Sequence, residues 1–297
     1  MHIGIDLGGT KTEGVVLNNQ GIEQVRLRLA TPAAEGYQSI LNTIIRLIDQ
    51  LEAEVATNCT VGIGTPGAIS TVTGMMKNCN TTCLNNQPLL DDLQQRLQRP
   101  LRIANDANCF ALSEAVDGSG AGHKVVFGVI MGTGVGGGVI FDSKLHPGHQ
   151  HIAGEWGHNI LEQAGPHCYC GHRGCVETLI SGPGLAADYH PHDGQQRLTA
   201  KEIVTLAAQG DAQAEAAMQR FLDRFGRALA MVINILDPDA IVLGGGLSNI
   251  ERLYIEGRER IADYVFNDEF STPVLKNTHG DSSGVRGAAQ LWLPQGE

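Results

Sequence analysis

The sequence lacks the features typical of proteins that bind nucleic acid, span a membrane or depend on disulfide bonds. No run of lysine and arginine occurs in this chain of net charge −11, which disfavours nucleic acid as a partner because such binding neutralises phosphates with basic side chains. No apolar stretch approaches the length of a membrane span. The seven cysteines are odd in number, and four show no framework spacing, which favours a reducing compartment: Cys59, Cys79, Cys83 and Cys109.

Two further absences concern targeting and domain organisation. Met1 leads almost directly into a strand-like run, without a basic segment followed by an apolar one, so we expect no signal peptide and a cytoplasmic protein. No low-complexity or linker-like segment separates two halves. With 297 residues, of which 42% are hydrophobic and 18% charged, the chain is long enough for two domains or one large one.

The segment from Gly154 to Glu177 is the most informative part of the sequence. Ten residues after His158 begins a CxCxxxxC array, in which Gly171 and Gly174 let the backbone turn tightly. Three thiolates and one imidazole complete the closed tetrahedral shell of structural zinc. The predicted ligands are His158, Cys168, Cys170 and Cys175.

The same segment leaves alternatives open. His167 and His172 also lie in the loop, so the choice of His158 as fourth ligand is less certain than that of the sulfurs. Three free cysteines and a surface histidine are the alternative to a metal site. Glu155 and Glu177 bracket the array, where they are better placed to hold a polar ligand beside the metal than to bind the metal.

Strand-like and helix-like segments alternate along the chain, which indicates an α/β protein. Strand–glycine turn–strand units at residues 3–17 and 125–142 suggest a duplicated architecture. We predict a small domain at 1–117 completed by a C-terminal helix at 283–297, and a large domain at 118–282 that carries the zinc loop. Further strands are expected at 60–67, 101–105 and 240–246, and helices at 40–51, 89–97, 106–116, 214–236 and 280–292.

Three glycine-rich turns follow apolar strands and predict a nucleotide site. Backbone N–H groups of such turns can bind phosphate oxygens, although a single turn of this kind is more often only a hairpin. Neither the Walker pattern nor a strong Rossmann fingerprint is present. The candidate residues are Gly8, Gly9, Thr10 and Lys11 in the first turn, Gly132, Thr133 and Gly134 in the second, and Gly244, Gly245 and Gly246 in the third.

Two aspartates adjoin predicted strands. Asp6 precedes the first glycine turn, and only there could a carboxylate help to bind Mg²⁺, because Met131 occupies the comparable place before the second turn. Asp106 follows a strand and opens a helix, where a carboxylate can accept a proton from a substrate hydroxyl. Turn capping by Asp6, and helix capping by Asn105 or Asp106, are the structural alternatives.

In their order along the chain, DLGGTKT, TPG, NDAN, GTGVGGG, GEWGH and CxCGxxGCxE resemble the motifs of the ROK sugar kinases. The resemblance covers nearly the whole chain, from Ile3 to Trp292. It implies an actin/hexokinase-like (ribonuclease H-like) duplicated fold, with two domains around a cleft and a structural zinc knot. It also implies ATP with Mg²⁺ as phosphoryl donor and a hexose as acceptor, in a protein that is commonly a homodimer.

The resemblance also implies roles for individual residues. Asp106 is then the catalytic base, and His158 serves both zinc and sugar. The three glycine turns hold the phosphates and the adenosine of ATP. The implied sugar ligands are Asn80, Asn105, Glu155, His158 and Glu177.

The segments at 77–89 and 279–292 most resemble fructokinases of the manno(fructo)kinase type, so D-fructose is the expected substrate. N-acetylglucosamine or N-acetylmannosamine kinase, or glucokinase, is the alternative within the family. A non-catalytic sugar-binding or regulatory protein is the alternative outside the kinases. The segment between GH and the first cysteine is shorter than in fructokinases of this type, which leaves the shape of the sugar site less defined.

Overall fold

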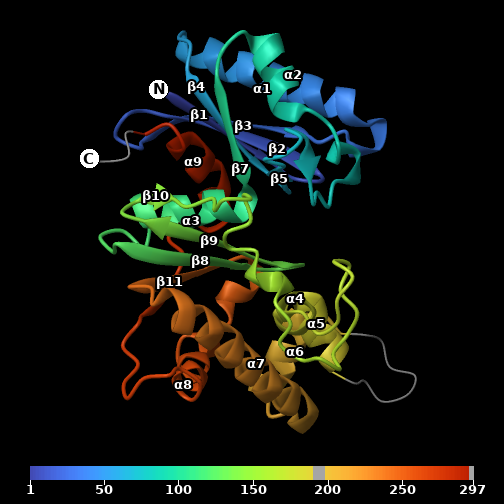
Figure 1. Ribbon diagram of the computed structural model, residues 1–297, viewed down its shortest axis with the longest axis vertical. Helices are drawn as coiled ribbons and strands as arrows, with labels where there is room; N and C mark the ends of the chain where they lie inside the picture. Colours follow the sequence, from blue (N-terminus) through green and yellow to red (C-terminus); the bar gives the residue numbers. More distant parts are fainter. Residues whose placement is uncertain (190–197, 294–297) are drawn as a thin grey trace. The chain divides into compact units, whose positions relative to one another are not determined.

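The computed structural model describes residues 1–189 and 198–293. Its chain divides into two compact units, each made of separate segments (Figure 1). Unit 1 comprises residues 1–124, 138–153 and 278–297, and unit 2 comprises 125–137 and 154–277. The end of the predicted C-terminal helix, 294–297, lies outside the described residues. This division differs from the predicted domains, because 118–124, 138–153 and 278–282 group with unit 1.

The two five-stranded sheets repeat one strand order: each places its strands, numbered by their sequence order within the sheet, as third, second, first, fourth and fifth. The first sheet is β3-β2-β1-β4-β7 and the second is β10-β9-β8-β11-β12. This repetition is the architecture that the paired hairpins predicted. The strands of the first sheet are β1 (His2–Leu7), β2 (Lys11–Leu17), β3 (Glu23–Ala30), β4 (Thr60–Thr65) and β7 (Leu101–Asn105). Those of the second are β8 (Val125–Met131), β9 (Val135–Phe141), β10 (Lys144–Leu145), β11 (Ala240–Gly244) and β12 (Val274–Lys276).

In unit 1, alternation along the strands gives the first sheet two apolar faces. One face packs against α1 (Tyr37–Val55) and α2 (Leu89–Leu97) (Figure 1). Ile3 and Ile5 are fully buried in this layer. The other face packs against α9 (Ser283–Gln290), which also contacts α3 (Asp106–Val116). Glycines in the strands permit the close packing of α9 on the sheet. A methyl group added at Gly4 would lie 2.0 Å from a carbonyl oxygen of α9, and one added at Gly62 would lie 1.9 Å from another.

A buried carboxylate ties the C-terminal end of α3 to two other segments of unit 1. One oxygen of Glu114, Oε2, accepts hydrogen bonds from the backbone N–H groups of Ser119 at 3.1 Å and Thr278 at 2.9 Å. The other, Oε1, accepts from the N–H of His279 at 3.1 Å and the hydroxyl of Ser283 at 2.7 Å. Because Glu114 is 0% exposed, these donors supply the hydrogen bonds that water would give to an exposed carboxylate.

Unit 2 packs helices around the long helix α7 (Ala212–Leu236). Phe221 and Phe225 of α7 are buried in the core of unit 2. The helices α8 (Glu256–Ala262) and α6 (Ala200–Ala208) pack beside α7. The shorter helices α4 (Val176–Ile180) and α5 (Gly182–Asp188) follow the cysteine-rich loop and also contact α7. Among the described residues of both units, no helix combines the length and apolar composition needed to cross a membrane.

Short elements complete the chain. They are the strands β5 (Ala68–Ile69) and β6 (Met76–Lys77), and the 3-10 turns η1 (Ala33–Glu35), η2 (Thr82–Leu84), η3 (Trp156–His158), η4 (Gly246–Asn249), η5 (Glu251–Leu253) and η6 (Gly280–Ser282).

Candidate functional site

In unit 1 the predicted acidic residues meet at one edge of the first sheet. Strands β1, β4 and β7 run parallel, so their carboxyl ends lie at the same edge. Asp6 pairs with Gly64 of β4, and the next residue of β4, Thr65, pairs with Asn105 of β7. Asp6 and the Asn105–Asp106 pair therefore lie at the same end of the sheet, on strands that have only β4 between them.

The start of α3 separates the roles of Asn105 and Asp106. Asn105 is the N-cap, with its side-chain oxygen accepting from the N–H of Ala107 at 3.0 Å. Asp106 is the first residue of the helix, is exposed, and accepts from the same N–H at 2.8 Å. The capping role expected of one of the two residues thus belongs to Asn105, and the Asp106 carboxylate is held at the helix N-terminus.

The environment of Asp6 opposes ionisation of its carboxyl group. Burial is the main cause that raises its pKa to about 6, and the carboxylates of Asp106 and Glu13 raise it further. Lys11 acts in the opposite direction. A site with concentrated carboxylate oxygens suits a hard divalent cation, so Asp6 fits the predicted Mg²⁺ role in its ligand chemistry.

The first glycine turn connects β1 to β2 directly beside Asp6. The N–H of Gly8 donates to the carbonyl of Lys11 at 3.0 Å and closes the turn. Any approach of Gly8 to a phosphate therefore depends on its small size, and not on its own N–H. Gly9, Thr10 and Lys11 are exposed, as is Asn80, the predicted sugar contact.

In unit 2 the second and third glycine turns lie at the carboxyl ends of neighbouring parallel strands. Gly244 of β11 pairs with Ile130 of β8, just before the turn at 132–134. Gly245 has φ +77°, and a side chain there would lie 2.4 Å from the carbonyl oxygen of Met131. Glycine is therefore required where these two strands end together.

A pocket of about 890 Å³ opens beside these turns. Its size is within the range of small-molecule and cofactor sites. Of the residues predicted for a nucleotide site, Gly132, Thr133 and Gly246 line this pocket, whereas Gly134, Gly244 and Gly245 are not among its lining residues. The pocket also has lining residues that sequence reasoning missed, namely Gly182, Pro183, Ala186, Leu198, Thr199, Ala200, Lys201, Val204, Thr205, Leu247, Asn249 and Ile250.

Part of the missed lining had a recognisable sequence pattern. Thr199 and Glu202 form a capping box, in which each side chain hydrogen-bonds the other residue's backbone N–H. The pattern Thr-x-x-Glu predicts a helix start. It therefore locates the first turn of α6, which contributes Thr199 and Lys201 to the pocket.

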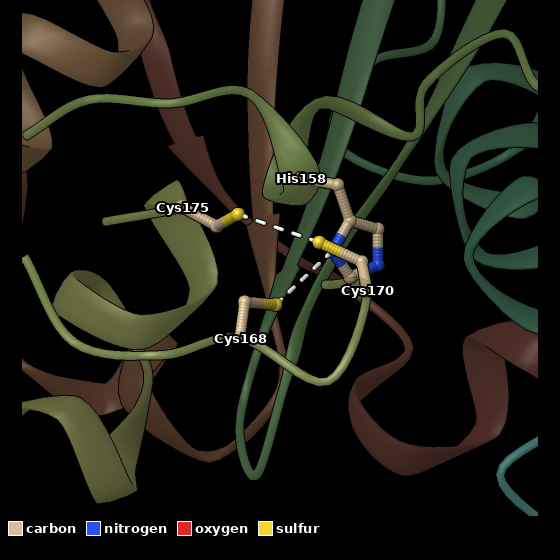
Figure 2. A group of neighbouring side chains, drawn as sticks. All are labelled: His158, Cys168, Cys170 and Cys175. Carbon is tan, nitrogen blue, oxygen red and sulfur yellow. Dashed lines mark hydrogen bonds between the residues drawn. The ribbon is translucent and has the colours of Figure 1, made fainter. Parts of the chain in front are cut away.

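The predicted metal ligands converge in the loop of unit 2 (Figure 2). One ligand atom from each of His158, Cys168, Cys170 and Cys175 lies within 4.8 Å of every other. The sulfurs of Cys170 and Cys175 are 3.6 Å apart, and that of Cys168 is 3.6 Å from Nδ1 of His158. Tetrahedral zinc at about 2.3 Å from sulfur requires ligand atoms roughly 3.8 Å apart, so the group fits a metal ion of this kind.

The loop geometry explains why glycines punctuate the array. Gly171 and Gly174 have φ of +94° and +66°, in the left-handed region. A side chain at Gly174 would lie 1.5 Å from the carbonyl oxygen of Glu162, so this position accepts no other residue without rearrangement. Of the alternative ligands, His167 contacts Arg173, and His172 contacts Cys170 from outside the four-residue group.

The carboxylates that flank the loop have distinct surroundings. Glu177 lies in α4, and its Oε2 accepts a hydrogen bond from the N–H of Val135 at 2.9 Å. This bond connects the cysteine-rich loop to the second glycine turn. Glu155 precedes η3, the turn that carries His158.

Tyr169 is a further residue that sequence reasoning missed. Its hydroxyl lies 3.1 Å from Nε2 of His158. Burial raises the pKa of this phenol to about 12, and the nearby charges of Glu177 and Glu155 contribute. Its position between Cys168 and Cys170 was the only indication in the sequence.

The chain is similar to known proteins over nearly its whole length. A sequence profile of the ROK family matches residues 2–295. The chain is 39% identical over 305 residues to the N-acetyl-D-glucosamine kinase of Pasteurella multocida, with 99% of each protein covered. The ROK hexokinase of Thermus thermophilus has a TM-score of 0.88 at 29% identity, covering 98% of this chain and 97% of that one. The ROK family glucokinase of Streptomyces griseus, in complex with glucose and AMPPNP, has a TM-score of 0.79 at 29% identity over 98% of each chain.

The repeated sheets, together with these matches, define a kinase of the actin/hexokinase-like duplicated fold, which confirms the predicted fold class. The chain belongs to the ROK family.

Proposed function

We propose that this protein transfers the γ-phosphoryl group of ATP to the 6-hydroxyl of N-acetyl-D-glucosamine. The observation that carries this proposal is the end-to-end match, at 39% identity, to a curated N-acetyl-D-glucosamine kinase. That match favours the N-acetylhexosamine alternative of the sequence analysis over D-fructose. The predicted catalytic and binding residues, the homodimer and the cytoplasmic location stay predictions.

Asp106 is the proposed catalytic base. Its carboxylate is exposed at the first turn of α3, where the strand before it and the helix after it fix its position. A carboxylate held in this way accepts the proton of the sugar hydroxyl as its oxygen attacks phosphorus in line. Asp6 lies at the same end of the sheet, with β4 between the two strands, and is the proposed ligand of Mg²⁺. The metal would neutralise charge that develops on the transferred phosphate.

The nucleotide is proposed to bind through the glycine turns. The pocket beside Gly132, Thr133 and Gly246 has the volume and the partly apolar lining for an adenosine. Lys201 is the only lysine or arginine among the described residues that line it, so it is the side chain suited to a phosphate or ribose oxygen. The turn at residues 8–11 is proposed to hold the phosphate that is transferred.

The sugar is proposed to bind through side chains that hydrogen-bond its hydroxyl groups: the carboxylates accept, the amides donate or accept, and the histidine donates when its other ring nitrogen holds a metal ion. A site of polar side chains that a bound sugar shields from water discriminates between sugars, because a missing hydroxyl leaves one of these side chains unpaired. Zinc is proposed to hold His158 and the loop before Glu177 in place without taking part in chemistry. The proposed sugar ligands are Asn80, Asn105, Glu155, His158 and Glu177.

The test is ADP release by the purified protein with ATP and Mg²⁺. N-acetylglucosamine, N-acetylmannosamine, glucose, mannose and fructose are compared at subsaturating concentrations. The highest kcat/KM for N-acetylglucosamine is expected. Highest kcat/KM for fructose would restore the first interpretation, and a folded, zinc-loaded protein that turns over no sugar would point to a binding or regulatory protein.

A second experiment tests the base. Asp106→Asn is expected to bind sugar normally and to lose roughly two to four orders of magnitude in kcat, the contribution typical of a general base. Asp49→Asn, an exposed change of the same kind on α1, is the matched control. A kcat for Asp106→Asn close to that of the control would remove Asp106 from this role.

A further inference from the structure

Three arginines lie on one face of the long helix α7, and the middle one contacts two separate segments of unit 2. Arg220, Arg224 and Arg227 have the helical spacing that places their side chains above one another along the helix. The Arg220 guanidinium donates to the carboxylate of Asp188, and that of Arg227 lies 3.7 Å from the carboxylate of Glu162. Arg224 contacts both carboxylates.

Arg224 holds the two carboxylates with different nitrogens of its guanidinium group. Nε donates to Oε1 of Glu162 at 2.8 Å and Nη2 donates to Oε2 at 3.3 Å, which makes a bidentate pair. Nη1 donates to Oδ1 of Asp188 at 2.7 Å. The Arg224 side chain is 15% exposed. Because the guanidinium is planar and its donors are fixed in direction, it determines where both carboxylates lie relative to each other.

Glu162 lies at the base of the cysteine-rich loop. Its N–H donates to the carbonyl of Gly174 at 3.1 Å, and its own carbonyl oxygen is the atom that leaves no room for a side chain at Gly174. Two residues before it, Ile160 pairs with Cys175 in an antiparallel bridge. Glu162 is therefore attached to the part of the loop that leads directly into α4 and Glu177.

Asp188 is the last residue of α5, a helix that lies beside the proposed nucleotide pocket. Gly182, Pro183 and Ala186 of this helix line the pocket. The N–H of Gly182 donates to the carbonyl of Gly132 at 2.8 Å, which attaches the start of α5 to the second glycine turn. A displacement of Asp188 would therefore move one wall of the pocket.

Residues 162–188 thus form one continuous segment, and a single side chain holds its two ends. The segment contains a proposed sugar ligand, Glu177, and one wall of the proposed nucleotide pocket. We propose that Arg224 is a positioning residue, which clasps the ends of this segment and so fixes the sugar ligand relative to the pocket wall. The inference rests on the proposed function and extends it to the alignment of the two substrates. Alignment matters because in-line phosphoryl transfer is sensitive to small displacements of the reacting groups.

The test is Arg224→Lys, which keeps the positive charge and removes the planar fork that bonds both carboxylates. We expect kcat to fall about tenfold or more, because the two substrates are less well aligned. KM for each substrate should stay within about twofold of the wild type, because the surfaces that bind them are unchanged. Glu162→Gln weakens the clasp from the loop side and is expected to show the same split, a lower kcat with unchanged KM.

Arg220→Lys and Arg227→Lys are the matched controls. Each replaces an arginine on the same face of α7 that contacts one end of the segment, Asp188 for Arg220 and Glu162 for Arg227. Both controls should keep kcat within about twofold of the wild type, since partly exposed ion pairs of this kind contribute little.

Hydrogen exchange followed by mass spectrometry supplies a measurement that needs no turnover. Arg224→Lys is expected to speed exchange of backbone N–H groups in both 159–175 and 182–189. Arg227→Lys should do so in the first range alone, and Arg220→Lys in the second alone. Exchange in Arg224→Lys equal to that of the wild type would refute the clasp.

Other outcomes also overturn the inference. Equal losses of kcat in all three lysine variants would make the arginines a common stabilising face, and a loss confined to KM would assign Arg224 to the binding of one substrate. A wild-type kcat in Arg224→Lys would remove its positioning role. Failure of the proposed function is seen separately, in the wild-type sugar panel: if another hexose is preferred, the same variants are compared with that sugar. A wild type that turns over no hexose refutes the proposed function and the positioning role together.

Discussion

Replacement of Glu114 by glutamine is expected to lower the stability of unit 1 substantially. The two carboxylate oxygens accept from three backbone N–H groups and from hydroxyls. Glutamine has the same shape, but one oxygen becomes an NH₂ group. In either orientation of the amide, at least one backbone N–H then faces another donor.

The magnitude follows from the number of donors that lose their acceptor. If the NH₂ replaces Oε2, the N–H groups of Ser119 and Thr278 both lose their acceptor. If it replaces Oε1, only the N–H of His279 does, because the hydroxyl of Ser283 can accept from the NH₂ and donate to the carbonyl of Gly280 at 3.0 Å. The second orientation is favoured, and one buried donor without a partner costs about 1–3 kcal/mol. For a unit of this size this is a fall in Tm of roughly 2–12 °C.

Thermal unfolding followed by circular dichroism measures this effect. Glu54→Gln, at an exposed position of α1, is the matched control and is expected to leave Tm within about 1 °C. Gly118→Ala tests the same contact from the other side, because an added methyl group would lie 2.2 Å from Oε2 of Glu114. A Tm for Glu114→Gln equal to that of Glu54→Gln would refute the reasoning.

Three further predictions concern the metal loop, the packing of α9 and the response to acid. Cys170→Ser is expected to lose bound zinc and several degrees of Tm, measured by elemental analysis and calorimetry, whereas Cys83→Ser retains both; full activity without zinc would refute the bracing role. Gly62→Ala is expected to cost about 1–3 kcal/mol in urea unfolding, since α9 must move away from the added methyl group, and an unchanged midpoint would contradict the packing. Burial opposes ionisation of Asp188, but hydrogen bonds from Arg224 and a second arginine lower its pKa overall. Because the folded pKa is depressed, its stabilising contribution is present above the unfolded pKa of about 4 and is lost as pH falls through the folded value. The wild type and Asp188→Asn should therefore converge in unfolding free energy in acid, and a constant difference at every pH would contradict this.

Most helices and strands that carry periodic apolar residues, or whose ends are marked by capping or turn residues, were predicted from the sequence. The helix expected at 89–97 has these bounds, and the strand–helix junction at 105–106 is where NDAN indicated. The four predicted metal ligands converge because they lie close together in one loop, so their local spacing determines the geometry. Local sequence is sufficient in each of these cases.

Other features depend on contacts between distant segments. No residue of β3 (Glu23–Ala30) is fully buried, so the strand carries no clear apolar alternation in its sequence. It forms a strand because it pairs with β2, and this pairing cannot be read from the sequence of β3 alone. The pocket lining joins residues 132–133, 182–186, 198–205 and 246–250, which no local pattern relates. The contact between Tyr169 and His158 was missed because it depends on the orientation of both side chains.

The packing of α9 has a consequence for the order of events during synthesis. Val285 and Ala289 cover Val15 and Leu17, and Gly287 lies against the backbone of Cys109 in α3. Translation produces α9 only after the whole of unit 2, so the sheet face of unit 1 stays uncovered on the nascent chain until then. The helix that presents Asp106 thus gains its neighbour last. Newly made chains should expose this face to chaperones for as long as translation of residues 125–277 takes.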